Sequence, residues 1–305
     1  MAAPNDLQAA IARNQRIDKL FVLGGLVATF IGIMTLGALI FDLAYDGLGR
    51  LSWQFFASFP SRFAARAGIL SAWVGTLLVM LVTALTAVPL GIAAGVYLEE
   101  YAPKNWLTAL IEINIANLAG VPSIVYGLMA LGLFVYQLQL GQSVLTAGLT
   151  LALLILPIVI VATREAIRAV PQSMREAALA LGATKWQMVK DHVLPYSTGG
   201  ILTGVIIALS RAIGETAPLI TIGALTFIAF LPDPPFTSEF PFISFGWLFS
   251  PFTVMPIQMF NWVSRPQEEF HWNAAATGLV LMAMTLAINA VAIWLRYRFR
   301  KRIKW

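Results

Sequence analysis

Residues 173–195 read SMREAALALGATKWQMVKDHVLP, a charged interruption between two long apolar stretches. Ser173 followed by Glu176 fits a capping box, in which each side chain bonds the backbone N–H of the other residue at the start of a helix. The alanines and leucines that follow favour a helix, and Gly182 suits the left-handed turn that ends one. The first half of this stretch is therefore predicted to be a short helix that stops at a glycine.

The second half of the stretch repeats this pattern. Thr184 followed by Gln187 fits another capping box, and Pro195 is predicted to follow the end of the second helix. Helices this short are marginal in water on their own, so they need a surface to dock on. A membrane face would make the stretch an amphipathic interfacial loop, whereas a second protein would make it a coupling element.

The composition of the chain indicates a membrane protein. Of its 305 residues 59% are hydrophobic and 11% are charged, whereas a soluble domain carries about 25% charged residues. The absence of cysteine excludes disulfides and thiolate chemistry, and two histidines are too few for a histidine-rich metal site. The net charge of +5 comes mostly from Lys and Arg beside apolar segments, which favours membrane anchoring over the binding of nucleic acid.

Apolar segments long enough to span a membrane, about 20 residues each, recur along the chain. The six predicted spans are residues 20–41, 71–98, 112–136, 143–163, 197–230 and 273–295. The first is longer than the apolar region of a cleaved signal peptide. The predicted organisation is an N-terminal tail over 1–19, a first span over 20–41, a domain with the other five spans over 71–295 and a basic tail over 296–305.

Lysines and arginines indicate the orientation of the spans. If both termini face the cytoplasm, most of these residues lie in cytoplasmic segments, as the positive-inside rule requires. Residues 173–195 then face the cytoplasm as well, while residues 231–272, rich in proline and aromatics, face outside. Within it, residues 252–272 are interpreted as a cap over a pathway, as a contact for an external binding protein, or as an interfacial aromatic belt. The predicted location is the plasma (inner) membrane of a bacterium, with the basic tail on anionic lipid.

Four of the predicted spans contain a proline, namely Pro89, Pro122, Pro157 and Pro218. An interior proline removes a backbone hydrogen bond, and in lipid the freed carbonyl must find a partner in the protein or in a cavity. The four prolines are compatible with ordinary helix bending and with a bundle that surrounds an internal path.

Two charges lie inside the predicted fifth span. Arg211 and Glu215 are four residues apart, hence expected on one face of one helix. A charge at the bilayer centre costs roughly 2.5–3.5 kcal/mol on insertion scales, so such residues tend to face the bundle interior. Pro218 would clash with the carbonyl of Gly214, which predicts a helix distortion between the two charges. The pair is interpreted either as a structural ion pair or as part of a transport path.

Residues 173–195 resemble the EAA loop in the permease subunits of type-1 ABC importers. The resemblance rests on Glu176, Ala177, Ala178, Gly182, Leu194 and Pro195. His192 stands where that family usually has isoleucine. In that family the loop docks on the ATPase subunit, so the resemblance implies that these residues form an ATPase coupling loop.

Three further stretches narrow the resemblance. Residues 121–127 (VPSIVYG) resemble both permeases of phosphate-specific ABC importers, and residues 214–219 (GETAPL) and 255–266 resemble the PstA type. With the loop, the similarity covers about residues 71–300. It implies an all-α integral membrane protein with six transmembrane helices, the type-1 (MetI-like) permease fold and cytoplasmic coupling helices.

The resemblance also implies a role for the charged residues. Arg211 would help phosphate through the bundle, because a guanidinium matches phosphate oxygens with paired donors. Glu215 would pair with Arg211 when phosphate is absent. Arg164, at the cytoplasmic end of the fourth predicted span, is a weaker candidate, since the positive-inside rule alone accounts for a basic residue there.

A complex of several proteins is the expected working form. The chain has no Walker loop of the form G-x-x-x-x-G-K-[ST], so ATP and Mg are expected on a partner ATPase of PstB type and no cofactor on this chain. A second permease of PstC type and an external phosphate-binding protein of PstS type complete the expected importer. Alternatives are a permease for another oxyanion or small solute, a stand-alone channel, and an integral-membrane enzyme, for which the spans offer few acids and no HExxH.

Overall fold

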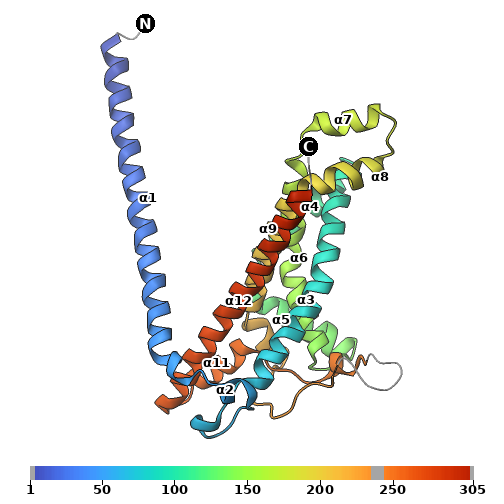
Figure 1. The fold of residues 1–305 in the computed structure, drawn as a ribbon. Helices are drawn as coiled ribbons and strands as arrows, with labels where there is room; N and C mark the ends of the chain where they lie inside the picture. Colours follow the sequence, from blue (N-terminus) through green and yellow to red (C-terminus); the bar gives the residue numbers. More distant parts are fainter. Residues whose placement is uncertain (1–3, 235–243, 303–305) are drawn as a thin grey trace.

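The structure is a computed structural model that describes residues 4–234 and 244–302. The described residues form helices and connecting segments, with an isolated β-bridge between Ser143 and Pro251. Five unbroken helices of this part of the chain are long and apolar enough to cross a membrane (Figure 1). They are α1 (Pro4–Gly47), α3 (Leu70–Val96), α6 (Val144–Arg168), α9 (Leu194–Ile213) and α12 (Glu268–Arg302).

The remaining predicted crossing, residues 112–136, is a bent pair of helices instead of one straight span. The pair consists of α4 (Trp106–Leu118) and α5 (Ser123–Ala130), which the π-helical segment η4 (Leu131–Gln137) continues. The two parts meet at 105°. The sequence predicts a proline-distorted span here, and the distortion is a full break because Pro122 disfavours a helical conformation at the residue before it, so α4 does not run on through Val121. If the pair counts as one crossing, the total agrees with the six predicted.

The segment between α3 and α4 is also more helical than predicted. Residues 99–111 are predicted as a polar turn, but α3 continues through a π-helical turn, η3 (Tyr97–Tyr101). α4 then begins at Trp106, because the side chain of Asn105 accepts a hydrogen bond of 2.9 Å from the backbone N–H of Thr108 and caps the helix. Glu99 and Glu100 therefore sit on a helical turn and not in a loop.

The core of the bundle surrounds α6, which packs against α3 and α9. Leu151, Ile155 and Val159 of α6 share one apolar cluster with Val79 of α3 and Ala208 of α9, and all are buried. By contrast, the apolar stretch of α1 is uncovered by the rest of the chain. Figure 1 shows that α1 leans away from the bundle and that its C-terminal end meets the start of α12. A helix that is apolar all round and uncovered in this way belongs in a membrane.

The two ends of the bundle carry different elements. α7 (Gln172–Ala180) and α8 (Lys185–Met188) lie at one end, the α7–α8 end, together with the first turns of α1 and the last turns of α12 (Figure 1). α2 (Trp53–Ala57) and α11 (Met255–Val263) lie at the opposite end. The start of α1, the end of α12 and the stretch 173–195 therefore lie at the same end of the molecule.

The outer segment predicted over 231–272 is largely folded onto the bundle, although residues 235–243 of it lie outside the described residues. α11 packs against α12 and α3, and the backbone N–H of Met255 donates to Oγ1 of Thr76 at 2.9 Å. Trp262 is fully buried, whereas Phe260 is exposed. An aromatic belt needs exposed rings, so that interpretation does not fit Trp262. The short helices η1 (Leu48–Arg50), η2 (Ala64–Arg66) and η6 (Gly246–Phe249) complete this end.

Candidate functional site

The fifth predicted crossing is broken close to the predicted pathway residues. α9 ends at Ile213 with Gly214 at its C-cap, and α10 (Ala217–Thr221) follows with Pro218 in its first turn. At that place the missing N–H of proline costs no helical hydrogen bond. The single span predicted over 197–230 is wrong, because the helix ends at Ile213 and a separate helix starts at Ala217. The interruption falls where the sequence predicts a distortion.

Arg211 and Glu215 lie on either side of this helix end. Nε of Arg211, in the last turn of α9, donates to Oε1 of Glu215 at 3.3 Å. The predicted distortion ends α9 between the two residues, but the pair still forms because Gly214 keeps near-helical backbone angles (φ −92°, ψ −4°). The side chain of Arg211 is 42% exposed and that of Glu215 is 19% exposed. The guanidinium therefore faces space that this chain does not fill.

A second break separates α4 from α5, within residues 121–127. Pro122 stands at the N-cap of α5. Oη of Tyr126 donates to the carbonyl oxygen of Leu118 at 2.8 Å, and the backbone N–H of Val121 donates to the same oxygen at 3.1 Å. These bonds satisfy a carbonyl that the end of α4 leaves unpaired. Non-helical backbone at membrane depth is tolerated where protein covers it or where it lines a water-filled cavity.

The two breaks contact each other, because α5 packs along α10. The two helices approach closely at Gly127, where an added Cβ would overlap Oγ1 of Thr221 and lie 2.6 Å from Cα and 2.8 Å from the carbonyl oxygen of Pro218. Two stretches that the sequence singles out, 121–127 and 214–219, are thus neighbours in space. Discontinuous helices that meet inside a bundle are the arrangement with which membrane transporters surround a solute.

Gly127→Ala is expected to destabilise the protein by about 1–3 kcal/mol, as overpacking of a close contact does. The added methyl group meets the backbone of Pro218, which cannot move aside as a flexible side chain would. The midpoint of thermal unfolding of the purified protein in lipid nanodiscs measures the effect. Gly132→Ala is the matched control, because nothing lies within 4 Å of a Cβ at that position. Equal midpoints for the two variants would contradict the close approach of α5 and α10.

The turn between α7 and α8 has the predicted local structure. Gly182 adopts a positive φ of +85°, which L-residues with a side chain rarely adopt. The side chain of Thr184 accepts from the backbone N–H of Gln187 at 3.3 Å, and Oε1 of Gln187 accepts from the backbone N–H of Thr184 at 2.8 Å. The second capping box is therefore confirmed.

Both outer limits of the pair of short helices differ from the prediction. The capping box at Ser173 is absent, because α7 already begins at Gln172, directly after Pro171 at the N-cap. The second helix does not end before Pro195 either. α8 runs through a π-helical turn, η5 (Val189–Val193), into α9, and Pro195 lies in the first turn of α9. This placement leaves the missing N–H at a helix start, where it is tolerated.

The short helices have a packed face and an exposed face. The packed face buries a set of residues against the end of α6, namely Ala178, Met188, Val189 and Val193 against Ile167 and Val170. Leu181 is 90% exposed and Trp186 is 59% exposed. Exposed apolar side chains of this size are candidates for contact with another protein or with a membrane surface.

The predicted coupling residues divide between the two faces. Glu176, Ala177 and Gly182 are exposed, Ala178 is buried, and Leu194 and Pro195 are half-buried. His192, which stands where the related permeases usually have isoleucine, is exposed in η5. A polar ring at an exposed position leaves no gap in the core, so this departure does not disturb the packing of the loop.

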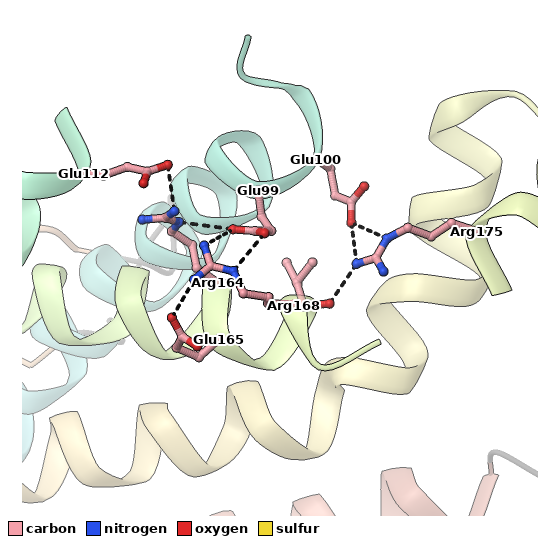
Figure 2. Close-up of polar contacts among 8 residues, drawn as sticks. Glu99, Glu100, Glu112, Arg164, Glu165, Arg168 and Arg175 are labelled. Atoms are coloured by element: carbon pink, nitrogen blue, oxygen red, sulfur yellow. Dashed lines mark hydrogen bonds and ion pairs between the residues drawn. The ribbon is translucent and has the colours of Figure 1, made fainter. Parts of the chain in front are cut away.

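Arg164 belongs to a charged cluster at the α7–α8 end (Figure 2). Its Nη2 contacts Oε1 of Glu112 on α4 at 2.7 Å, and its Nε contacts Oε2 of Glu99 at 3.4 Å. Arg168 holds the same Glu99 through two hydrogen bonds of 2.9 and 3.2 Å. The side chain of Arg164 is only 10% exposed. A basic residue placed only by the positive-inside rule would be expected in contact with water, so that rule alone does not account for Arg164.

Arg175 on α7 is a member of the cluster that sequence reasoning missed. Its Nε and Nη2 donate to Oε1 of Glu100 at 3.1 and 3.0 Å (Figure 2). Nη1 donates to the carbonyl oxygen of Val170 at 2.6 Å and Nη2 to that of Ile167 at 2.8 Å. The side chains of Arg175 and Glu100 are 13% and 7% exposed. The signal in the sequence that could have pointed to this cluster is the pair of adjacent acids, Glu99 and Glu100, directly after a predicted span.

Comparison with known proteins adds four similarities to this geometry. The family described as "Binding-protein-dependent transport system inner membrane component" matches residues 87–305. The chain is 32% identical over 297 residues to the probable ABC transporter permease protein YqgI of Bacillus subtilis (strain 168), covering 95% of this chain and 99% of the other. It is 33% identical over 276 residues to the phosphate transport system permease protein PstA of Yersinia pestis, covering 89% and 86%. A chain of the inward-facing MetNI methionine ABC transporter has a similar fold, with a TM-score of 0.55 at 16% identity over 76% of this chain and 94% of that chain.

The chain therefore belongs to the family of inner membrane components of binding-protein-dependent transport systems. It is a multi-pass membrane permease of an ABC importer and has the type-1, MetI-like fold. It is a transport component and not an enzyme. A permease of this kind works with an ATPase and a substrate-binding protein.

Proposed function

We propose that this chain is the PstA-type permease of an ATP-driven importer of inorganic phosphate and forms half of the path across the membrane. The observation that carries the proposal is the Arg211–Glu215 pair, which lies at a helix break with the arginine side chain 42% exposed. The similarity to PstA of Yersinia pestis over 89% of this chain supports phosphate as the solute.

The chemistry of the pair suits the passage of a phosphate ion. A guanidinium is charged at every physiological pH and offers parallel N–H groups that match two phosphate oxygens. Glu215 neutralises Arg211 when no anion is present, which lowers the penalty of a charge at membrane depth. The same carboxylate competes with phosphate for Arg211, so the ion is not held too tightly to leave.

Arg164 is the proposed last contact of the anion on the cytoplasmic side. A cavity of about 460 Å³ opens beside it and is lined by basic and acidic side chains, among them Arg164, Arg168, Lys104, Glu99 and Glu112. Three cations around one cavity attract an anion, while the two acids limit how long it stays. This arrangement supports a role of Arg164 beyond membrane anchoring.

The α7–α8 end is the proposed cytoplasmic side, together with both termini. Leu181 and Trp186 would dock in a PstB-type ATPase, which binds ATP and Mg. Glu176, Ala177 and Gly182 form the rest of the exposed face there. A PstC-type permease would supply the other half of the path, and a PstS-type binding protein would deliver phosphate at the opposite end.

Reconstitution of the importer tests this function. The chain is placed in proteoliposomes with its partner permease, its ATPase and its external binding protein, and the ATP-dependent uptake of radioactive phosphate is measured. Uptake is expected to require this chain, and unlabelled sulfate in excess is expected not to compete. Uptake that persists without the chain would reject the proposal. Uptake of sulfate or another solute, but not of phosphate, would support the alternative of a permease for a different oxyanion or small solute.

A further inference from the structure

We propose that Glu99 and Glu100 form a transmission point through which movement of α7 and α8 reaches the helices of the path. The two residues are neighbours in the π-helical turn η3, at the end of α3. Their carboxylates contact different partners: Glu100 contacts Arg175 of α7, and Glu99 contacts the arginines of α6 (Figure 2). The inference rests on the proposed docking of α7 and α8 on an ATPase but does not depend on which solute is carried.

The contact of Glu100 with Arg175 ties α7 to the end of α3. Both side chains are almost excluded from water, at 7% and 13% exposure. Separation of the two would leave a charge buried without a partner, which is strongly unfavourable. Arg175 also bonds the carbonyl oxygens of Ile167 and Val170 at the end of α6. A displacement of α7 therefore has to carry the ends of α3 and α6 with it.

The contacts of Glu99 continue this connection into the bundle. Glu99 binds Arg168 through both carboxylate oxygens and Arg164 through one of them. Arg164 in turn contacts Glu112 at 2.7 Å, so α4 is joined to the same group. Three helices, α3, α4 and α6, are thereby held together at the α7–α8 end by one set of ion pairs (Figure 2).

From α4 the contacts lead to the helix breaks. The carbonyl oxygen of Leu118, at the end of α4, accepts the hydrogen bond of Tyr126 in α5. α5 touches α10 at Gly127 and Pro218, next to the end of α9 that carries Arg211. A continuous series of contacts thus runs from α7 to the proposed phosphate contact.

Ion pairs are better suited to this role than the apolar packing beside them. Ala178 and Met188 pack against the end of α6, but apolar contact is non-directional and allows surfaces to slide. Paired hydrogen bonds between guanidinium and carboxylate fix both distance and orientation. The ion pairs can therefore transmit a small rotation or shift of α7.

The first test measures the coupling of ATP hydrolysis to transport in the reconstituted importer. Glu100→Gln and Arg175→Gln are each expected to lower the phosphate carried per ATP hydrolysed by at least about fivefold, the range of typical coupling between sites. The association with the ATPase and its rate of hydrolysis are expected to persist, because the exposed face with Leu181 and Trp186 is unchanged. The double variant is expected to be no worse than Arg175→Gln alone, since both changes remove one contact.

Glu165→Gln is the matched control. Glu165 is a carboxylate of the same cluster, but its side chain is 63% exposed and, among the described residues, its ion pair is with Arg168 on its own helix. This variant is expected to keep the wild-type ratio of phosphate to ATP. Wild-type ratios in Glu100→Gln and Arg175→Gln would overturn the proposal. A ratio that falls only together with loss of the bound ATPase would also overturn it, because the contact would then serve assembly.

A second measurement is independent of the solute. The chain contains no cysteine, so spin labels at Ser173→Cys on α7 and Ile113→Cys on α4, both exposed positions outside the proposed docking residues, report the distance between α7 and α4 in a complex whose other subunits lack cysteine. In the wild type this distance is expected to change little when the ATPase binds ATP, because the two parts move together. In Glu100→Gln the distribution is expected to shift and broaden on ATP binding.

The two measurements distinguish failure of this inference from failure of the proposed function. An importer that carries no phosphate would reject phosphate as the solute, while the label distances would still report on the transmission point. An unchanged distance in Glu100→Gln, or the same broadening in Glu165→Gln, would overturn the transmission point even if phosphate uptake is normal.

Discussion

Arg211→Gln is expected to lower ATP-driven phosphate uptake by about 10- to 100-fold, because a hydrogen bond to a charged group contributes about 1.5–3 kcal/mol. Glutamine keeps much of the length and polarity of the side chain but loses the permanent charge and the paired donors. The arginine side chain is 42% exposed, so its replacement is expected to leave the packing intact. The initial rate of uptake by the reconstituted importer, at equal amounts of assembled complex, measures the effect.

Two further variants separate the pathway role from a structural ion pair. Arg66→Gln is the control, because Arg66 is an exposed arginine on η2 at the opposite end, and its uptake is expected to match the wild type. Glu215→Gln removes the partner but keeps the cation, so it is expected to retain more uptake than Arg211→Gln. Near wild-type uptake by Arg211→Gln would contradict the pathway role. Equal loss of thermal stability and uptake in both variants of the pair would favour the structural interpretation.

Leu181→Asp is expected to abolish stable association with the ATPase. Leu181 is 90% exposed at the tip between α7 and α8, so it contributes nothing measurable to the fold of this chain. If it fills a pocket of the ATPase, the charge loses that contact and must be desolvated. Central interface residues contribute about 2 kcal/mol or more, which corresponds to a roughly 30-fold loss of affinity. Co-purification of the ATPase with the permease pair, followed by titration, measures the change.

Leu138→Asp provides the matched control for this effect. Leu138 is 55% exposed and lies beyond η4 and before α6, at the opposite end of the bundle. The same substitution there is expected to leave ATPase binding unchanged. Retention of wild-type affinity by Leu181→Asp would show that the α7–α8 turn is not the docking surface, and the amphipathic interfacial loop would then be the better interpretation.

Local signals in the sequence predict the α7–α8 turn because the interacting atoms are close along the chain. Thr184 and Gln187 bond each other three residues apart, and Gly182 needs only its own backbone angles. The first capping box fails for an equally local reason. Pro171 stands at the N-cap and α7 begins directly after it, so Ser173 is already inside the helix.

Apolar composition predicts how often the chain crosses the membrane but not where a crossing breaks. The bend at Pro122 and the end of α9 at Gly214 lie within stretches that are apolar enough overall to be predicted as single spans. Proline indicates that a distortion occurs near these places. It does not distinguish a kink from a full break, because the outcome depends on how the neighbouring helix packs. Gly127 against Pro218 is such a contact, and it joins residues far apart in the sequence.

The pairing within the charged cluster cannot be predicted from local sequence patterns. Arg175 and Glu100 are 75 residues apart, and Arg168 and Glu99 are 69 residues apart. Each residue alone resembles an ordinary charge at the end of a span. Their burial and pairing follow from the way the ends of α3 and α6 meet α7, which a pattern along one segment does not contain.

The π-helical turn η5 sets the direction in which α8, with the exposed Trp186 of the proposed docking face, points around the axis of α9. α8, η5 and α9 form one continuous helical rod from Lys185 to Ile213. Since a helix turns by about 100° per residue, the loss of one residue from η5 would swing α8 and the exposed Trp186 by about that angle around the axis of α9. The length of η5 is therefore expected to tolerate neither an insertion nor a deletion of one residue, because either would turn the proposed docking face away from its partner. The side chain of His192 is exposed on η5, so its replacement is expected to leave this orientation unchanged.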